Sequence, residues 1–213
     1  MFTQSLEQET RAGKTTCVVG VVGFSDTGKT TLLELLIPRL RARDLTVGAV
    51  KHASHGFDAD QPGKDSHRIY QAGADAVALV SKHQIATFRR REQGEARLDE
   101  ALAEMPTGLD LVLVEGFAWE AVPRFVLTRP GEAPAREHVE AGAVLGVVEV
   151  AEPVPGRPPV FDTDVLEALV EQVEHRVFAV RMTGATSLVG MRKPWLSTPL
   201  EYAKEGTRWR SVM

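Results

Sequence analysis

Cysteine and long apolar runs are scarce in this sequence. A single cysteine, Cys17, among 213 residues excludes an intramolecular disulfide and a zinc site made of cysteines, and a small buried hydrophobic role is the expectation for it. No apolar run reaches the ~20 residues that a membrane-spanning helix needs. Residues 1–14 are polar and hold no apolar segment typical of a secretory signal. We therefore expect a cytoplasmic protein that does not associate with membranes.

An excess of positive charge is also missing. The net charge of −4 argues against nucleic-acid binding, and the brief basic run at 89–91 is followed by acidic residues, which favours a solvated surface. The charge is unevenly distributed, because residues 176–213 hold seven basic and two acidic residues. A chain of this length accommodates one substantial α/β domain with extensions, but not two full domains.

One motif organises the rest of the chain. Residues 23–30 read G-F-S-D-T-G-K-T and match the phosphate-binding loop pattern G-x-x-x-x-G-K-[ST] at every fixed position. The two glycines let the backbone N–H groups curl toward phosphate oxygens. Lys29 supplies a cation for the β- and γ-phosphates, and the Thr30 hydroxyl suits Mg²⁺. The candidate nucleotide contacts are Gly23, Ser25, Asp26, Thr27, Gly28, Lys29, Thr30 and Thr31.

The surroundings of this loop fit the motif. Residues 16–22 are an apolar, β-branched run typical of a buried strand, and residues 31–40 predict a helix with Leu32, Leu36 and Leu40 on one face. The positive end of the helix dipole would then lie under the phosphate. Pro38 predicts a kink or a tightened turn near the end of this helix.

The remaining pattern alternates strands with helical segments, which predicts an α/β fold of three layers with a mainly parallel sheet. The segment 84–89 could pair with its predecessor 76–81 antiparallel, as a sheet edge or as a projecting hairpin. Asp162, Thr163 or Asp164 could cap the last helix. Strands are predicted at 45–51, 76–81, 84–89, 110–116, 124–128, 143–148 and 177–180, and helices at 65–71, 95–104 and 164–173.

A second signature is the apolar strand at 110–116, which ends in Glu115. In phosphate-loop proteins an acid at this place approaches Mg²⁺ directly or through water. Thr30 and Glu115 are therefore the candidate metal ligands, and Lys29 and Glu115 are the candidate catalytic residues.

The loop at 51–66 is long and rich in histidine and aspartate, and we expect it to face the phosphate loop. Its residues His52, His55, Asp58 and Asp60 have ligand chemistry for a transition metal. No second histidine-rich segment completes such a cluster, so hydrogen bonding within the loop or contact with phosphate is the favoured reading.

Four segments, together with the phosphate loop, resemble the MobB family of molybdopterin guanine dinucleotide biosynthesis, over about residues 16–175. They are K-H at 51–52, F-D-A-D-Q-P-G-K-D-S at 57–66, A-G-A at 72–74 and L-V-E-G-F at 113–117. The resemblance implies a P-loop NTPase fold similar to dethiobiotin synthetase, GTP and Mg²⁺ as cofactors, and a homodimer. It also implies a partner, a MobA-type molybdenum cofactor guanylyltransferase, with molybdopterin as that partner's substrate.

The resemblance also implies roles for single residues. Gly28, Lys29, Thr30 and Thr31 would bind phosphate, with Glu115 near Mg²⁺ and Lys51 as a second cation near the terminal phosphate. We expect Asp60 and Asp65 to contribute to the ligand site, because the loop at 51–68 would meet the partner. The expected domains are an N-terminal extension at 1–15, a nucleotide-binding domain at 16–175 and a basic C-terminal extension at 176–213 with no predicted structure.

Three classes of function fit these residues. A nucleotide-binding accessory protein with slow hydrolysis leads, because no motif of an organic-substrate pocket is visible. A small-molecule kinase or ligase of the dethiobiotin synthetase-like class, using ATP or GTP, is the alternative. A metallochaperone GTPase is disfavoured by the single cysteine. Asparagine is absent, so the guanine signature N-K-x-D is missing and GTP rests on the resemblance alone.

Overall fold

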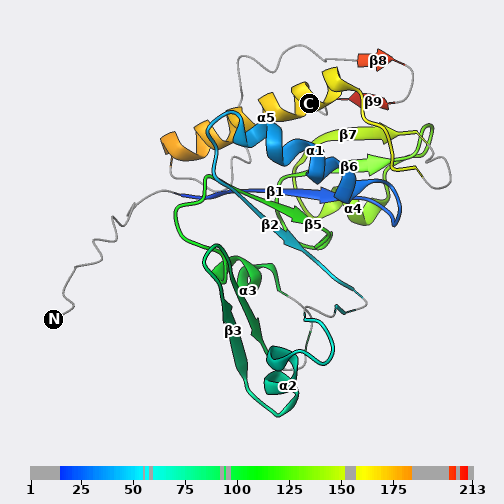
Figure 1. The fold of residues 1–213 in the computed structure, drawn as a ribbon. Helices are drawn as coiled ribbons and strands as arrows, with labels where there is room; N and C mark the ends of the chain where they lie inside the picture. Colours follow the sequence, from blue (N-terminus) through cyan, green and yellow to red (C-terminus); the bar gives the residue numbers. More distant parts are fainter. Residues whose placement is uncertain are drawn as a thin grey trace. The chain divides into compact units, whose positions relative to one another are not determined.

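The computed structural model of this chain describes residues 15–54, 56–57, 60–91, 94, 97–151 and 157–183, and the backbone of two short strands at 202–204 and 207–210. The chain divides into two compact units (Figure 1). One comprises residues 1–52 and 98–213, and the other comprises residues 53–97. Within the described residues no helix is long and apolar enough to cross a membrane.

The larger unit is built on a seven-stranded sheet of order β2-β5-β1-β6-β7-β9-β8. The first five strands in this order pair in parallel, whereas β9 pairs antiparallel with β7 and β8 antiparallel with β9. The predicted mainly parallel sheet is confirmed. The bounds are β1 Cys17–Val22, β2 Val47–Lys51, β5 Leu111–Glu115, β6 Arg124–Thr128, β7 Val144–Val150, β8 Tyr202–Lys204 and β9 Thr207–Arg210.

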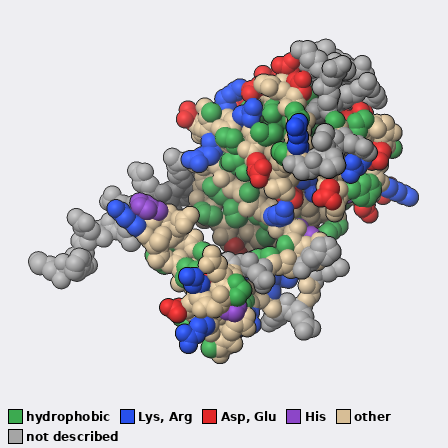
Figure 2. Space-filling view, turned by 45° about the vertical axis from the view of Figure 1, so that its right-hand side comes forward, with side chains coloured by type: hydrophobic (Ala, Val, Ile, Leu, Met, Phe, Trp, Pro, Cys, Tyr) green, Lys and Arg blue, Asp and Glu red, His purple; other side chains and the backbone are tan. Residues whose placement is uncertain are grey.

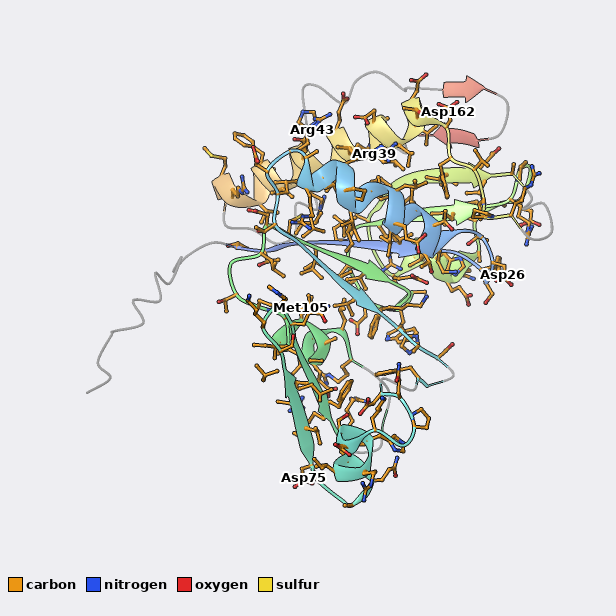
Figure 3. All side chains as sticks on the ribbon, in the orientation of Figure 1. Asp26, Arg39, Arg43, Asp75, Met105 and Asp162 are labelled. Carbon is orange, nitrogen blue, oxygen red and sulfur yellow. The ribbon has the colours of Figure 1, made fainter. Side chains whose placement is uncertain are left out.

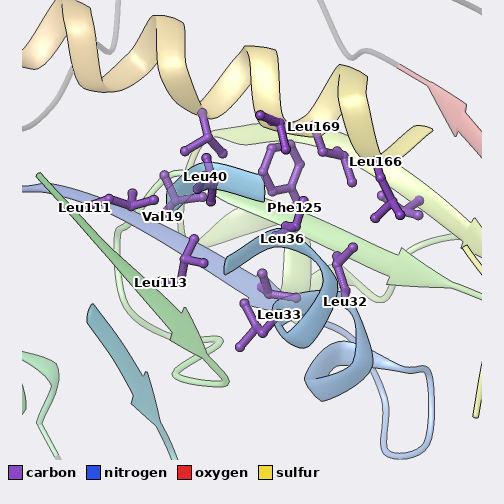
Figure 4. Close-up of a cluster of buried hydrophobic side chains, with 14 of the residues drawn as sticks. Val19, Leu32, Leu33, Leu36, Leu40, Leu111, Leu113, Phe125, Leu166 and Leu169 are labelled. Carbon is purple, nitrogen blue, oxygen red and sulfur yellow. The ribbon is translucent and has the colours of Figure 1, made fainter. Parts of the chain in front are cut away.

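Two helices pack together over the sheet and close the core. In α1 (Lys29–Arg41) the predicted apolar face is confirmed, because Leu32, Leu36 and Leu40 are fully buried. Figure 4 shows these leucines gathered between α1, the sheet and the long helix α5 (Thr163–Thr183). Each fully buried leucine contributes about 1.5–3 kcal/mol relative to an exposed one. The core therefore anchors the first turn of α1, which carries Lys29 and Thr30.

Ion pairs join the same two helices at the surface. Arg39 of α1 and Arg43, in the turn that follows α1, are labelled in Figure 3. Both contact Glu167 of α5, at 3.5 Å and 3.1 Å. Arg43 also contacts Glu174 at 2.5 Å. Such exposed pairs contribute little each, so the apolar contacts decide the packing. Elsewhere on the face seen in Figure 2, basic and acidic side chains are interspersed among the described residues.

The length of α5 overturns one prediction. The segment 177–180 is wrong as a strand, because it forms part of α5. Val173, Val177 and Val180 are buried whereas Phe178 is exposed, a spacing that continues the helical face rather than alternating as a strand does. The predicted cap is confirmed at Asp162, whose Oδ1 accepts a hydrogen bond from the Asp164 N–H at 2.8 Å.

Other details follow from local chemistry. Pro38 lies in the last turn of α1, which ends three residues later with the Ala42 N–H bonded to the Pro38 carbonyl. Cys17 is buried as expected, and burial raises the pKa of its thiol to about 11. Two further short helices are α3 (Leu98–Ala103) and α4 (Arg136–Glu140), and the sequence pattern did not predict α4.

The smaller unit holds the helix α2 (Asp65–Gln71) and the strands β3 (Ala76–Val80) and β4 (Ile85–Arg89). The two strands form an antiparallel sheet of their own, so the hairpin alternative is confirmed and the edge of the main sheet is excluded. Arg90 packs against Tyr70, with its Cζ 4.3 Å from the ring centroid, and its Nε donates to the Ala74 carbonyl at 3.1 Å.

Candidate functional site

The phosphate loop joins β1 to α1 with a backbone that only glycine adopts easily at two points. Gly23 has φ +150° and Gly28 has φ +89°. A Cβ on Gly23 would lie 2.6 Å from the Leu127 carbonyl oxygen, and one on Gly28 would lie 2.9 Å from Cγ of Pro159. Both glycines of the motif are therefore required by the packing of the loop as well as by its conformation.

Two side chains of the loop bond back to its own backbone. The Thr27 hydroxyl is buried and donates to the Phe24 carbonyl at 2.8 Å, and the Lys29 ammonium donates to the same oxygen at 2.6 Å. Burial lowers the pKa of Lys29, and the charge of Lys51 lowers it further, whereas the nearby Glu115 raises it.

The other predicted contacts of the loop differ in exposure. Ser25 and Asp26 are exposed at the loop surface, and Asp26 has φ +60°. Thr31 is partly buried in the first turn of α1.

Thr30 of the first turn of α1 meets Lys51 and Glu115, the last residues of β2 and β5. The Thr30 hydroxyl lies 2.9 Å and 3.0 Å from the two carboxylate oxygens of Glu115. The Lys51 ammonium lies 3.0 Å from Glu115 Oε1 and 3.1 Å from Thr30 Oγ1. Glu115 is only 7% exposed, so its charge is paired away from bulk water.

The sheet register explains why these residues meet. Lys51 and Glu115 are direct neighbours in the parallel pair β2 and β5, and Val21 of β1 is the neighbour of Glu115 on its other side. Because parallel strands end at one edge of the sheet, the last residues of β2 and β5 face the loop that follows β1.

The donor set fits a hard divalent cation. A carboxylate and a threonine hydroxyl are oxygen ligands of the kind that Mg²⁺ prefers. A cation, the Lys51 ammonium, already contacts both oxygen-bearing groups, and its side chain is more than half exposed and free to turn away. Within the described residues no group of three or more histidine, cysteine, aspartate or glutamate side chains could hold a metal ion.

The predicted residues of the 51–68 loop are only partly placed. Asp60 and Asp65 belong to the smaller unit. There, Asp60 Oδ1 accepts a hydrogen bond from the Gln61 N–H at 2.8 Å, and Asp65 begins α2. Their roles toward a ligand stay predictions. His55 and Asp58 lie outside the described residues.

One neighbour of the loop was not found from the sequence. His138 of α4 is buried, and its ring lies edge-on to Phe24 of the loop with centroids 5.2 Å apart. Burial lowers the pKa of His138; Lys29 and Arg124 lower it further, and Glu137 raises it. Burial therefore favours the neutral imidazole, whose ring packs against Phe24 of the loop. A five-residue helix such as α4 has too little periodicity to be recognised in the sequence.

The sequence of the chain is similar to those of known proteins. The family model of MobB, described as molybdopterin guanine dinucleotide synthesis protein B, matches residues 18–150. A molybdopterin-guanine dinucleotide biosynthesis adapter protein of Escherichia coli is 39% identical over 147 residues, covering 68% of this chain and 83% of the relative. A protein of Haemophilus influenzae with the same description is 41% identical over 53% of this chain and 63% of its own length.

Solved structures show the same likeness in three dimensions. A crystal structure of molybdopterin-guanine biosynthesis protein B superposes with a TM-score of 0.58 at 31% identity, over 76% of this chain and 99% of the other. A MobB homologue from Bacillus stearothermophilus gives a TM-score of 0.54 at 29% identity, over 76% and 98%. The fold of the chain is therefore that of these proteins, a P-loop NTPase fold.

Proposed function

The chain belongs to the MobB family of molybdopterin guanine dinucleotide biosynthesis, and on this basis we propose that it binds GTP with Mg²⁺ and serves a nucleotidyltransferase as an adapter. The description of its relatives as adapter proteins supports the second part. The partner in this proposal is a MobA-type guanylyltransferase that acts on molybdopterin.

The observation that carries the proposal is the contact of Thr30, Glu115 and Lys51 beside the phosphate loop. Thr30 and Glu115 would hold the Mg²⁺ ion, which neutralises phosphate charge when bound. Lys51 would then move from Glu115 to the terminal phosphate, because its exposed ammonium loses its partner to the ion. Lys29 would release the Phe24 carbonyl for the phosphates, since a charged acceptor bonds more strongly than a carbonyl.

Slow hydrolysis is part of the proposal. The single hydroxyl hydrogen of Thr30 is shared between the two carboxylate oxygens of Glu115, and one of these oxygens also pairs with Lys51, so the charge of this acid already has partners. It is poorly placed to take a proton from an attacking water. Phosphoryl transfer depends on such positioning, and we expect weak intrinsic GTPase activity.

The test begins with equilibrium titration of the full chain with GTP and with ATP, each with Mg²⁺. The proposal expects GTP to bind more tightly. Turnover of a small-molecule acceptor at ordinary enzyme rates of ~1–10³ s⁻¹ would instead establish the kinase or ligase alternative.

The adapter role has its own test in a reconstituted reaction with the guanylyltransferase, GTP and molybdopterin. Asp60→Asn and Asp65→Asn should slow guanylylation of molybdopterin by several-fold while GTP affinity changes less than twofold. Asp75→Asn, in the same unit and outside the 51–68 loop, is the matched control and should behave as the unaltered chain. Equal losses in GTP binding and in guanylylation would show that the two aspartates serve the nucleotide instead of the partner.

A further inference from the structure

Three aromatic rings meet directly beyond the ends of β2 and β5. The His52 ring lies 5.0 Å from Phe117 and 5.0 Å from Trp119, centroid to centroid, and Phe117 lies 5.6 Å from Trp119. Phe117 is 3% exposed and Trp119 is 53% exposed. The aromatic cluster of His52, Phe117 and Trp119 thus has a buried base and an open indole.

The backbone that carries Trp119 is held rigidly. Gly116 has φ +85° and Phe117 has φ +51°, a conformation that costs a residue with a side chain free energy and is concentrated at functional sites. A Cβ on Gly116 would lie 3.0 Å from Cβ of His52, so the two segments approach closely.

The buried guanidinium of Arg124 holds the loop that carries Trp119 in place. Arg124 is completely buried, and its guanidinium donates to the carbonyls of Ala118 at 2.5 Å, of Val122 at 3.1 Å and of Glu120. Burial lowers the pKa of Arg124, yet an arginine keeps its charge in proteins. A buried charge bonded to three carbonyls of one short loop fixes that loop, so the indole is presented in a set orientation.

The aromatic cluster adjoins the phosphate site. His52 follows Lys51 directly, its N–H donates to the Glu115 carbonyl at 2.9 Å, and Phe117 is two residues beyond Glu115. The phosphate loop follows β1, and β5 and β2 come next to β1 in the sheet. Thr30 and Glu115 mark the terminal-phosphate end of a bound nucleotide. The rings therefore lie next to that end of the phosphate site.

We propose that the aromatic cluster is a stacking surface for the pterin ring of the second reactant. The inference rests on the proposed function, which supplies a pterin carrying phosphate. A pterin is planar and bicyclic, and aromatic side chains bind such rings by stacking. Guanine shares its fused 2-amino-4-oxopyrimidine ring, so the experiment has to separate the two sources.

The probe is 6-hydroxymethylpterin phosphate, and its fluorescence anisotropy is followed on the full chain saturated with GTP and Mg²⁺, and again without nucleotide. Trp119→Ala should weaken binding of the pterin about 10-fold, the usual scale for loss of one stacking partner. Trp119→Phe, which keeps a stacking face, should lose less than threefold. GTP affinity of both variants should stay within twofold of the unaltered chain.

Phe178→Ala is the matched control. This aromatic side chain is 63% exposed on α5, near Arg181, which pairs with Asp110 at the opposite end of β5 from Glu115. Its removal should leave pterin affinity unchanged. Circular dichroism on each variant shows that the fold is kept. If the alanine variant unfolds, Trp119→Leu, which fills space without an aromatic face, should show the same loss of pterin affinity.

Three results would overturn the inference. Equal pterin affinity for the unaltered chain and Trp119→Ala, or no pterin binding with or without GTP, would show that the rings are packing alone. A loss of GTP affinity in Trp119→Ala with no loss of pterin affinity would assign the rings to guanine. If the proposed function is wrong, the unaltered chain will not bind GTP, and this result is distinct from any change in pterin affinity.

Discussion

Among the described residues, the Lys29 ammonium donates a single hydrogen bond, to the carbonyl of Phe24 in its own loop. Its charge is therefore dispensable for the fold and needed by phosphate. We predict that Lys29→Ala lowers GTP affinity on the order of 100-fold, the scale of a hydrogen bond between charged groups, while the melting temperature shifts little. Isothermal titration with Mg·GTP measures this, with Lys82→Ala as the control for a lost surface charge. An unchanged affinity would refute the phosphate-loop assignment.

In the proposed function Glu115 acts through a bound cation. Glu115→Gln keeps the shape of the side chain and removes the charge that pairs with Lys51 and would hold Mg²⁺. GTP affinity should fall about 10-fold or more in Mg²⁺ and much less in EDTA. Glu34→Gln, an exposed change on α1, should alter neither value. Equal losses under both conditions would mean that Glu115 has only a structural role.

At the scale of elements, β9 lies along the edge of β7 and β8 follows it outward. The phosphate loop, Lys51 and Glu115 all lie outside this edge. We predict that deletion of residues 184–213 leaves GTP affinity within twofold. The exposed edge of β7 should make the truncated protein more prone to aggregate, which turbidity on heating would record. A large loss of GTP affinity would instead make the basic extension part of the site.

The β3–β4 hairpin bears on the assembly of the whole molecule. Val80 and Ile85, at the adjoining ends of its two strands, are about three-quarters exposed. An exposed apolar edge of this kind usually needs cover. Together with the homodimer that the sequence resemblance implies, this exposed edge supports our prediction that two copies associate. Light scattering at micromolar concentration should give twice the 23.3 kDa of one chain.

The hairpin can be tested directly by changing its apolar end. Val80→Lys with Ile85→Lys should shift the mass toward one chain, since paired lysines oppose association at an edge. A single change at an equally exposed apolar position of the other unit, Val160→Lys, should leave the mass unchanged. If the unaltered chain already gives the mass of a monomer, the predicted dimer is wrong.

The fold class and the phosphate-loop residues could be predicted from the sequence alone, because they depend on motifs that are contiguous in the chain. The strand, glycine-rich turn and helix of residues 17–41 are adjacent in the chain, so their chemistry and spacing can be read directly, and the fold class follows from the alternation of strands and helices. Glu115 was recognisable for the same reason, because it ends an apolar strand. The strand predicted at 177–180 from its apolar residues is wrong, because a buried helical face and a buried strand have similar composition over four residues.

Contacts between distant segments were decided only by the tertiary structure. The register of β2 against β5 places Lys51 beside Glu115, and that register depends on which strands become neighbours. The aromatic cluster joins His52 to two rings more than sixty residues later in the chain, and no local pattern encodes their meeting. The support of that cluster by Arg124 depends on complete burial of its charge, which is a property of the packed core. Sequence periodicity reports which side of an element is apolar, whereas the partner that covers this side is chosen by the packing of the whole chain.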